Sequence, residues 1–180
     1  MKQIKNRRDL MADKKQKPKK SRTRDVAEII LAFFVAWLGY QALALAAGTN
    51  LPVVAVVSDS MYHNSEFDDW WTSKASQYSQ LGVSEEQFLS FPFKNGLSRG
   101  DLLLVINQPP MTGDVIIYDR GNQFTIVHRL VKSTNGEYVT RGDNNLASDQ
   151  PIAKNQIKGK VVFAVPLLGY PRFLLFAFGI

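Results

Sequence analysis

The residues of this 180-residue chain that could act together on a carbonyl group are a serine, a histidine and an aspartate, in that order along the sequence. A serine hydroxyl is a poor nucleophile until a neighbouring base takes its proton, and a histidine base needs a third group to fix its tautomer. Ser60 follows the β-branched run 53–57, where a hydroxyl is expected to be exposed. His128 lies on an alternating strand, and Asp143 and Asp149 come next in a block of turn-forming residues.

Each of these residues also has a plainer structural interpretation. A serine after a strand is ordinarily a turn residue, and a single histidine on an apolar strand face is ordinarily packed in the core. A block such as Arg141 to Asp149 is ordinarily a loop rich in bonds between side chains and backbone. Taken singly, each signal is weak, and only their combination and order point to chemistry.

The composition excludes several other kinds of site. The chain has no cysteine, which excludes a thiol nucleophile, a disulfide framework and a cysteine-ligated metal. Two histidines are too few to suggest a histidine-based metal site, and no phosphate-binding or dinucleotide-binding glycine pattern is present. We therefore predict no metal and no organic cofactor.

Short strands are predicted to position these residues. β-branched or alternating segments fall at 53–57, 101–106, 114–118, 124–131 and 160–165. Asn135-Gly136 is a strong signal for a two-residue hairpin turn. One face of the fourth segment carries Phe124, Ile126, His128 and Leu130. The predicted fold class is mainly β, with a mostly antiparallel β catalytic domain over residues 49–165.

Residues 62–98 do not follow this pattern and are predicted to form an inserted lobe. The segment is long, polar and rich in aromatic residues, and a structureless loop of that length is unusual. Ser84 and Gln87 predict the capped start of a short helix. The Trp70-Trp71 pair either touches a membrane surface, a partner or a substrate, or it belongs to a small core of the lobe itself.

An apolar run over residues 26–48 predicts a transmembrane helix. No residue from 29 to 58 is charged, and a helix of about 22 residues spans about 33 Å, enough for a hydrocarbon core of about 30 Å. A cleavable signal peptide is the alternative, because Ala42-Leu43-Ala44 offers small residues two apart. The run is longer than a signal h-region, however, which favours an uncleaved anchor. A buried helix of a soluble protein is less favoured, because the run is apolar on all sides.

The C-terminal segment 166–180 is also apolar, apart from Arg172. Its last part, residues 173–180, is too short to span a bilayer. This part either dips into the outer leaflet or closes the hydrophobic core, and the sequence favours neither strongly.

The positive charge of the chain is concentrated in an N-terminal tail. Residues 1–25 hold eleven of the 22 Lys and Arg and three of the 16 Asp and Glu, a net charge of +8, which leaves −2 for the rest of a chain whose total is +6. A nucleic-acid-binding domain would carry basic charge on its body, so no nucleic acid is predicted as a partner. A basic tail before an apolar helix predicts a cytoplasmic N-terminus, with everything after residue 48 on the far side.

Taken together, these motifs resemble type I signal peptidases, most closely the archaeal and endoplasmic-reticulum branch. The resemblance covers nearly the whole chain. It rests on the N-terminal anchor, Ser60, the Gly113-Asp114 strand, Val127-His128-Arg129 and the block from Arg141 to Asp149. Bacterial members carry a lysine base at the position that His128 fills in this sequence. The insertion at 62–98 departs from the family pattern, so its role cannot be carried over.

The resemblance implies a role for each matching residue. Ser60 would be the nucleophile, His128 the general base, and Asp149 the acid that orients it, with Asp143 a second candidate for that acid or a support of the loop. The Ser60 backbone N–H and the Ser58 hydroxyl would stabilise the oxyanion.

His63 is the rival base. It lies three residues after Ser60, and no acid partner with the family's spacing follows it. We therefore expect His63 to be dispensable.

The implied function is that of a membrane-bound serine endopeptidase. It would remove N-terminal signal peptides from exported precursors, cutting after small residues in an Ala-x-Ala pattern. The implied partners are these precursors and the lipid bilayer, and the sequence does not show whether further membrane subunits are needed. The implied location is the cell membrane or the endoplasmic-reticulum membrane, in a single-pass arrangement.

Two alternatives remain, a membrane-tethered β-domain binding module and an inactive subunit of a peptidase complex. An inactive subunit would be expected to have lost Ser60 or His128, and both are present.

Overall fold

The computed structural model of the chain describes residues 22–121, 125–134 and 136–179. Most of the basic tail lies outside the described residues, as do Phe124 and Asn135 of the predicted strand and hairpin turn. The chain divides into two units, residues 1–39 and residues 40–180.

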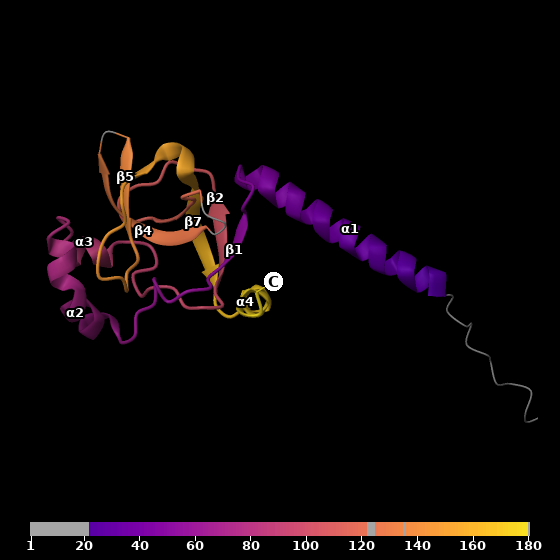
Figure 1. Cartoon of the computed structure of the whole chain (residues 1–180), viewed down its shortest axis with the longest axis horizontal. Coiled ribbons are helices and arrows are strands. Elements are labelled where there is room, and N and C mark those ends of the chain that lie inside the picture. Colours follow the sequence, from indigo (N-terminus) through magenta and orange to yellow (C-terminus); the bar gives the residue numbers. More distant parts are fainter. Residues whose placement is uncertain (1–21, 122–124, 135, 180) are drawn as a thin grey trace, which may run out of the picture. The chain divides into compact units, whose positions relative to one another are not determined.

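A seven-stranded sheet forms the body of the second unit (Figure 1). Its strands are β1 (Val53–Ala55), β2 (Leu102–Ile106), β3 (Val115–Tyr118), β4 (Ile126–Thr134), β5 (Glu137–Arg141), β6 (Ile152–Ala153) and β7 (Ile157–Val165). They lie in the order β1-β2-β7-β3-β4-β5-β6, and each pairing is antiparallel. A short 3-10 turn, η1 (Lys154–Gln156), joins β6 to β7. The prediction of a mainly antiparallel β fold is confirmed.

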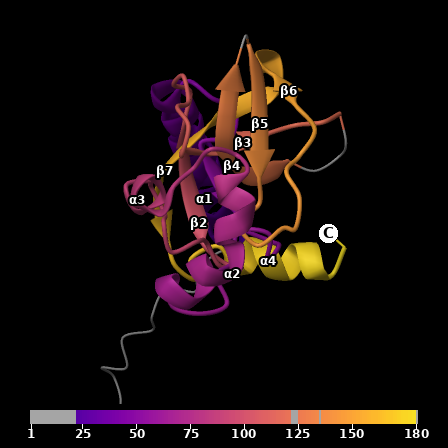
Figure 2. The same ribbon diagram turned by 90° about the vertical axis from the view of Figure 1, so that its left-hand side faces the viewer.

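β4 places its side chains on alternate faces of the sheet. Ile126 and Leu130 pack in the cluster that also holds Tyr118, whereas Val127 packs against the cluster on the opposite face. His128 stands between Ile126 and Leu130 in the strand, so its side chain points to the face of Tyr118. β4 and β5 form a long hairpin (Figure 2), which puts Thr140 opposite Leu130 on this same face.

Residues 62–98 contain two helices, α2 (Phe67–Ser79) and α3 (Glu85–Leu89), which Figure 1 shows together on one side of the sheet. Ser84 and Gln87 form the predicted capping box at the start of α3. Trp70 and Trp71 are 0% and 6% exposed and pack with Phe88 in a buried aromatic cluster. The interpretation of an exposed Trp pair is therefore wrong, because these rings form the lobe's own core.

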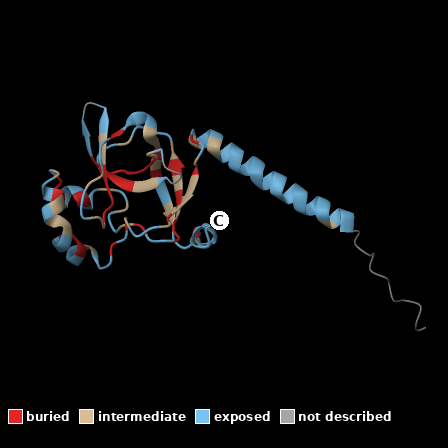
Figure 3. Cartoon of the chain, viewed as in Figure 1, coloured by how far each residue is buried: buried red, intermediate tan, exposed pale blue. Residues whose placement is uncertain are grey.

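α1 (Arg22–Ala47) is a helix long and apolar enough to cross a membrane. Arg22, Thr23, Arg24 and Asp25, which precede the predicted run, belong to the same helix. Its residues are largely exposed (Figure 3). Its last residues belong to the second unit, where the Asn107 backbone N–H donates to the Ala47 carbonyl at 2.8 Å.

The C-terminal segment forms a short helix, α4 (Tyr170–Ala177). Its start packs against the body, since the Gly169 N–H donates to the Gly100 carbonyl at 2.8 Å. Farther along, Leu174, Leu175 and Phe178 are exposed, so most of this helix does not contribute to the core of the chain.

Candidate active site

The loop after β5 holds the segment that carries Ser60. The Asn144 backbone N–H donates to the Ser60 carbonyl at 2.8 Å, and the Asn144 side chain donates to the Asp59 carbonyl at 3.2 Å. A side chain at Gly142 would stand 2.7 Å from the Ser60 carbonyl oxygen, so the close approach of the two segments requires glycine there. The two hydroxyls, Ser58 Oγ and Ser60 Oγ, lie 3.2 Å apart.

His128 and Asp149 form the second part of the site. His128 Nδ1 lies 2.6 Å from Asp149 Oδ2, and the histidine is only 6% exposed. The same oxygen accepts hydrogen bonds from Thr140 Oγ1 at 2.7 Å and from Tyr118 Oη at 2.9 Å. Asp149 is thus held from three neighbouring strands of the sheet.

The electrostatics of this pair determine which ring nitrogen is available as a base. Burial alone would raise the pKa of Asp149, but its hydrogen bond with His128 and the histidine's charge outweigh burial, so the pKa is lowered. The carboxylate is therefore ionised and can only accept hydrogen bonds, so the hydrogen on Nδ1 points to it. The other ring nitrogen, Nε2, then keeps its lone pair and can take a proton.

Asp143 occupies a different and fully buried place. Arg129 binds it through two donors, Nε to Oδ1 at 2.9 Å and a terminal nitrogen to Oδ2 at 2.7 Å. The Tyr78 hydroxyl donates to Oδ1 at 2.8 Å, and His63 Nε2 lies 3.1 Å from Oδ2. Burial would raise the pKa of Asp143, but the Arg129 charge and the hydrogen bonds of His63 and Arg129 lower it to about 2.

Arg129 also ties the lobe to the sheet. Its terminal nitrogens donate to the carbonyls of Pro92 at 2.7 Å, Gly113 at 2.9 Å and Phe93 at 2.9 Å. Its guanidinium lies over the Phe88 ring, 4.8 Å from the centroid. Asp143 and Arg129 therefore join the lobe to the loop that holds Ser60.

The predicted site residues thus form two groups. His128 is paired with Asp149, whereas Ser58 and Ser60 lie together beside the loop that contains Asp143. Among the described residues, no hydrogen bond joins the Ser60 hydroxyl to the His128 ring. His63 has an acid partner after all, Asp143, which the sequence order did not suggest.

Sequence reasoning missed Tyr118, Thr140 and the structural role of Arg129. Tyr118 and Thr140 each put a hydroxyl on the strand face that carries His128, next to positions filled by apolar residues. A polar side chain on an otherwise apolar strand face is the signal that points to Tyr118 and Thr140, but it can be used only once the pairing of the strands is known.

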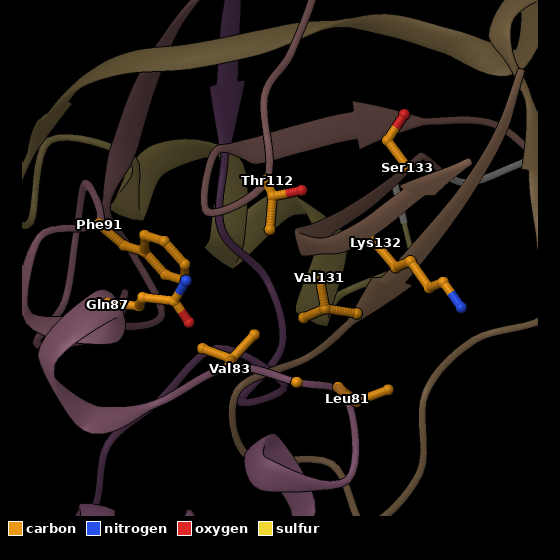
Figure 4. A pocket seen from close by; sticks show the side chains of 9 residues that line it. Leu81, Val83, Gln87, Phe91, Thr112, Val131, Lys132 and Ser133 are labelled. Atoms are coloured by element: carbon orange, nitrogen blue, oxygen red, sulfur yellow. The ribbon is translucent and has the colours of Figure 1, made fainter. Parts of the chain in front are cut away.

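A separate pocket of about 330 Å³ lies between the lobe and residues 131–133 of β4 (Figure 4). Leu81, Val83, Phe91 and Val131 give it apolar walls, and Lys132 also lines it. None of the candidate catalytic residues lines this pocket, so it is not part of the site.

The fold is an antiparallel β domain that carries a His128–Asp149 pair and, apart from it, the hydroxyls of Ser58 and Ser60. A serine, a histidine and an aspartate are the residue types that serine hydrolases use. Comparison with known proteins gives a more specific relationship. Residues of this chain are 36% identical over 104 positions to "Signal peptidase complex catalytic subunit SEC11" of Colletotrichum graminicola, covering 48% of this chain and 60% of that protein. The protein of the same name from Clavispora lusitaniae is 26% identical over 166 residues, covering 83% of this chain and 79% of that protein.

A third relative, the "Signal peptidase complex catalytic subunit sec11" of Pyrenophora teres f. teres, is 25% identical over 182 residues and covers 92% of this chain. No family model matches the chain, and no solved structure matches it. The chain is a homologue of these SEC11 subunits, which confirms the resemblance to the endoplasmic-reticulum branch of type I signal peptidases. The alignment with the Colletotrichum graminicola protein covers 60% of that protein, which is less than two thirds of its length.

Proposed function

We propose that this chain is a membrane-bound serine endopeptidase that removes N-terminal signal peptides from exported precursors, cutting after small residues. The observation that carries the proposal is the 2.6 Å contact between His128 Nδ1 and Asp149 Oδ2, which leaves Nε2 as a base. The relatives are named as catalytic subunits of a signal peptidase complex, which supports the cleavage of signal peptides by this chain. Because that name describes a complex, it also supports the presence of further subunits. The apolar length of α1 supports anchoring in a membrane.

In this reaction the Ser60 oxygen attacks the carbonyl carbon of the scissile peptide while His128 Nε2 takes the hydroxyl proton. Asp149 stabilises the imidazolium that forms, and the imidazolium gives the proton to the leaving amine. Water then attacks the resulting ester, with His128 as base again, and releases Ser60 and the new carboxylate. The Ser60 N–H and the Ser58 hydroxyl are the proposed donors to the oxyanion, a role that fits the 3.2 Å separation of the two hydroxyls.

β1 is the strand proposed to align the precursor. It lies at the edge of the sheet, paired with β2 on one side, and it leads directly to Ser60. An extended peptide can add to such an edge through main-chain hydrogen bonds, whatever its sequence. Shallow pockets that exclude large groups would then restrict cleavage to small side chains.

The test is incubation of the full-length protein in detergent with a precursor that carries an Ala-x-Ala site. We expect cleavage at that site, and we expect Ser60→Ala and His128→Ala each to lower kcat by about 10⁴-fold or more. His63→Ala is the control for loss of a buried histidine and should retain cleavage, because His63 Nε2 is bound to Asp143, which Arg129 and Tyr78 also hold. The reverse pattern of the two histidine variants would refute the assignment of the base. Folded wild-type protein that binds the precursor without cutting it would favour the binding module.

A further inference from the structure

We infer that Tyr118 and Thr140 are positioning residues, which hold the Asp149 carboxylate in the orientation that His128 requires. This inference rests on the proposed function, because it assigns a support to the acid of that reaction. The two hydroxyls donate to Asp149, the acid of the proposed reaction, so they would act on the reaction through that residue and are not catalytic residues in their own right.

The geometry places three donors around one carboxylate oxygen. Asp149 Oδ2 lies 2.6 Å from His128 Nδ1, 2.7 Å from Thr140 Oγ1 and 2.9 Å from Tyr118 Oη. Three donors that approach one atom fix its position far better than the histidine alone, since a carboxylate with a single partner can rotate about its side-chain bonds. Nδ1 and the phenol oxygen are 3.4 Å apart, and a phenol that donates to Asp149 cannot donate to Nδ1 as well.

The supports are rigid, whereas the acid is not part of a strand. Asp149 lies in the loop between β5 and β6, and its backbone N–H donates to the Thr140 carbonyl at 2.8 Å. Tyr118 and Thr140 are fully buried on β3 and β5, the strands on either side of the strand that carries His128. The sheet therefore fixes the histidine and both supporting hydroxyls, and these in turn fix the loop acid.

Both supports remain donors throughout the working pH range. Burial raises the pKa of Tyr118 to about 12, so the phenol stays protonated. The Thr140 hydroxyl does not ionise in this range. Neither hydroxyl therefore exchanges a proton with His128. A second ionisable partner of Asp149 would compete with His128 for that proton.

The kinetic test uses Tyr118→Phe and Thr140→Val in the full-length protein. Each variant removes one donor and keeps the shape of the side chain, so kcat is expected to fall about tenfold to hundredfold while KM stays within about twofold. Tyr138→Phe is the matched control, because Tyr138 packs in the same cluster and, among the described residues, donates to neither Asp149 nor His128. It should leave kcat unchanged.

The second measurement does not depend on cleavage. The chain has only two histidines, so ¹⁵N-histidine labelling gives one set of ring signals from His128 and one from His63. The wild type should show His128 protonated on Nδ1, with a low-field proton. Tyr118→Phe and Thr140→Val should shift this proton or speed its exchange with water, while the His63 signals stay in place.

The possible results separate this inference from the proposed function. If the wild type cleaves and both variants keep its kcat and its His128 signals, Tyr118 and Thr140 are not positioning residues. Equal losses in Tyr138→Phe would show a general packing effect and also overturn the inference. If the wild type does not cleave at all, the proposed function fails, and the ring signals still decide whether the hydroxyls hold Asp149 against His128.

Discussion

Asp143 and Asp149 lie six residues apart in one loop, yet each is bound by different residues, which suit the two aspartates to different roles. Asp149 faces His128 and two neutral hydroxyls, whereas Asp143 is enclosed by Arg129, Tyr78 and His63. The spacing of the two acids in the sequence left their roles open, because their partners come from distant strands and from the lobe. Asp149 is therefore our choice for the acid of the reaction, and Asp143 for the support of the loop.

The lowered pKa of Asp143 predicts that the stability of the protein depends on pH. Its pKa is about 2 in the folded protein, below its ordinary value of 3.8. The stabilisation is therefore fully present above pH 3.8 and is lost as the pH falls to about 2. We expect Asp143→Asn to lower the free energy of unfolding at pH 7 by about 3–5 kcal/mol, because Arg129 is left buried without its counter-charge.

The measurement is denaturant unfolding of both proteins between pH 7 and pH 2. The difference between wild type and Asp143→Asn should shrink as the pH falls below 3.8. Asp69→Asn, an exposed change on α2, serves as the control and should stay within about 0.5 kcal/mol of the wild type. A difference that is constant over the whole pH range would contradict the ion pair as its cause.

The sequence predicts a helix or strand well wherever the local pattern of residues decides its structure. The alternation along β4, the capping box at Ser84 and the apolar α1 are read from neighbours in the chain. β6 and η1 were missed, since a two-residue strand exists only because it pairs with β5. The contacts of His63 and Arg129 were missed for the same reason, because they depend on how the lobe packs against the sheet.

α4 and the residues beside it expose several apolar side chains. Leu174 is 50% exposed, and the neighbouring Leu167, Leu168 and Phe178 are exposed as well. The helix packs near β1, which starts six residues after the end of α1. A helix with exposed apolar side chains, in a chain proposed to be anchored in a membrane, is expected to bury those side chains about 5–10 Å into the membrane interface.

The absence of cysteine makes this depth directly measurable. A nitroxide on Leu174→Cys, in full-length protein in lipid vesicles, should be protected from a water-soluble relaxing agent and accessible to oxygen. A nitroxide on Met111→Cys, 69% exposed in the connection after β2, should show the opposite. Two labels that are equally accessible from water would show that α4 does not enter the bilayer.

Charge and hydropathy are distributed along the whole chain in a way that predicts an orientation in the membrane. Lys and Arg near the end of an apolar helix are retained in the cytoplasm, and acidic residues contribute little to this effect. Eleven basic residues precede residue 26, and none follows until Lys74. Ser60 and the rest of the proposed active site would then lie on the far side of the membrane, where the signal peptide of a translocated precursor emerges.

Cysteine accessibility in membrane vesicles reports both this orientation and whether α1 is retained as an anchor. In sealed, right-side-out membrane vesicles, an impermeant maleimide should label Met111→Cys at once and Ala12→Cys only after permeabilisation. Replacing the eleven basic residues of the tail by glutamine should give a mixture of orientations, because the charge difference across α1 is then lost. If the mass of the mature protein shows that the N-terminal segment with residue 12 has been removed, then α1 is cleaved and does not remain as an anchor. Labelling of Ala12→Cys in intact vesicles would reverse the proposed topology and separate the serine from its precursors, because the active site would then face the cytoplasm.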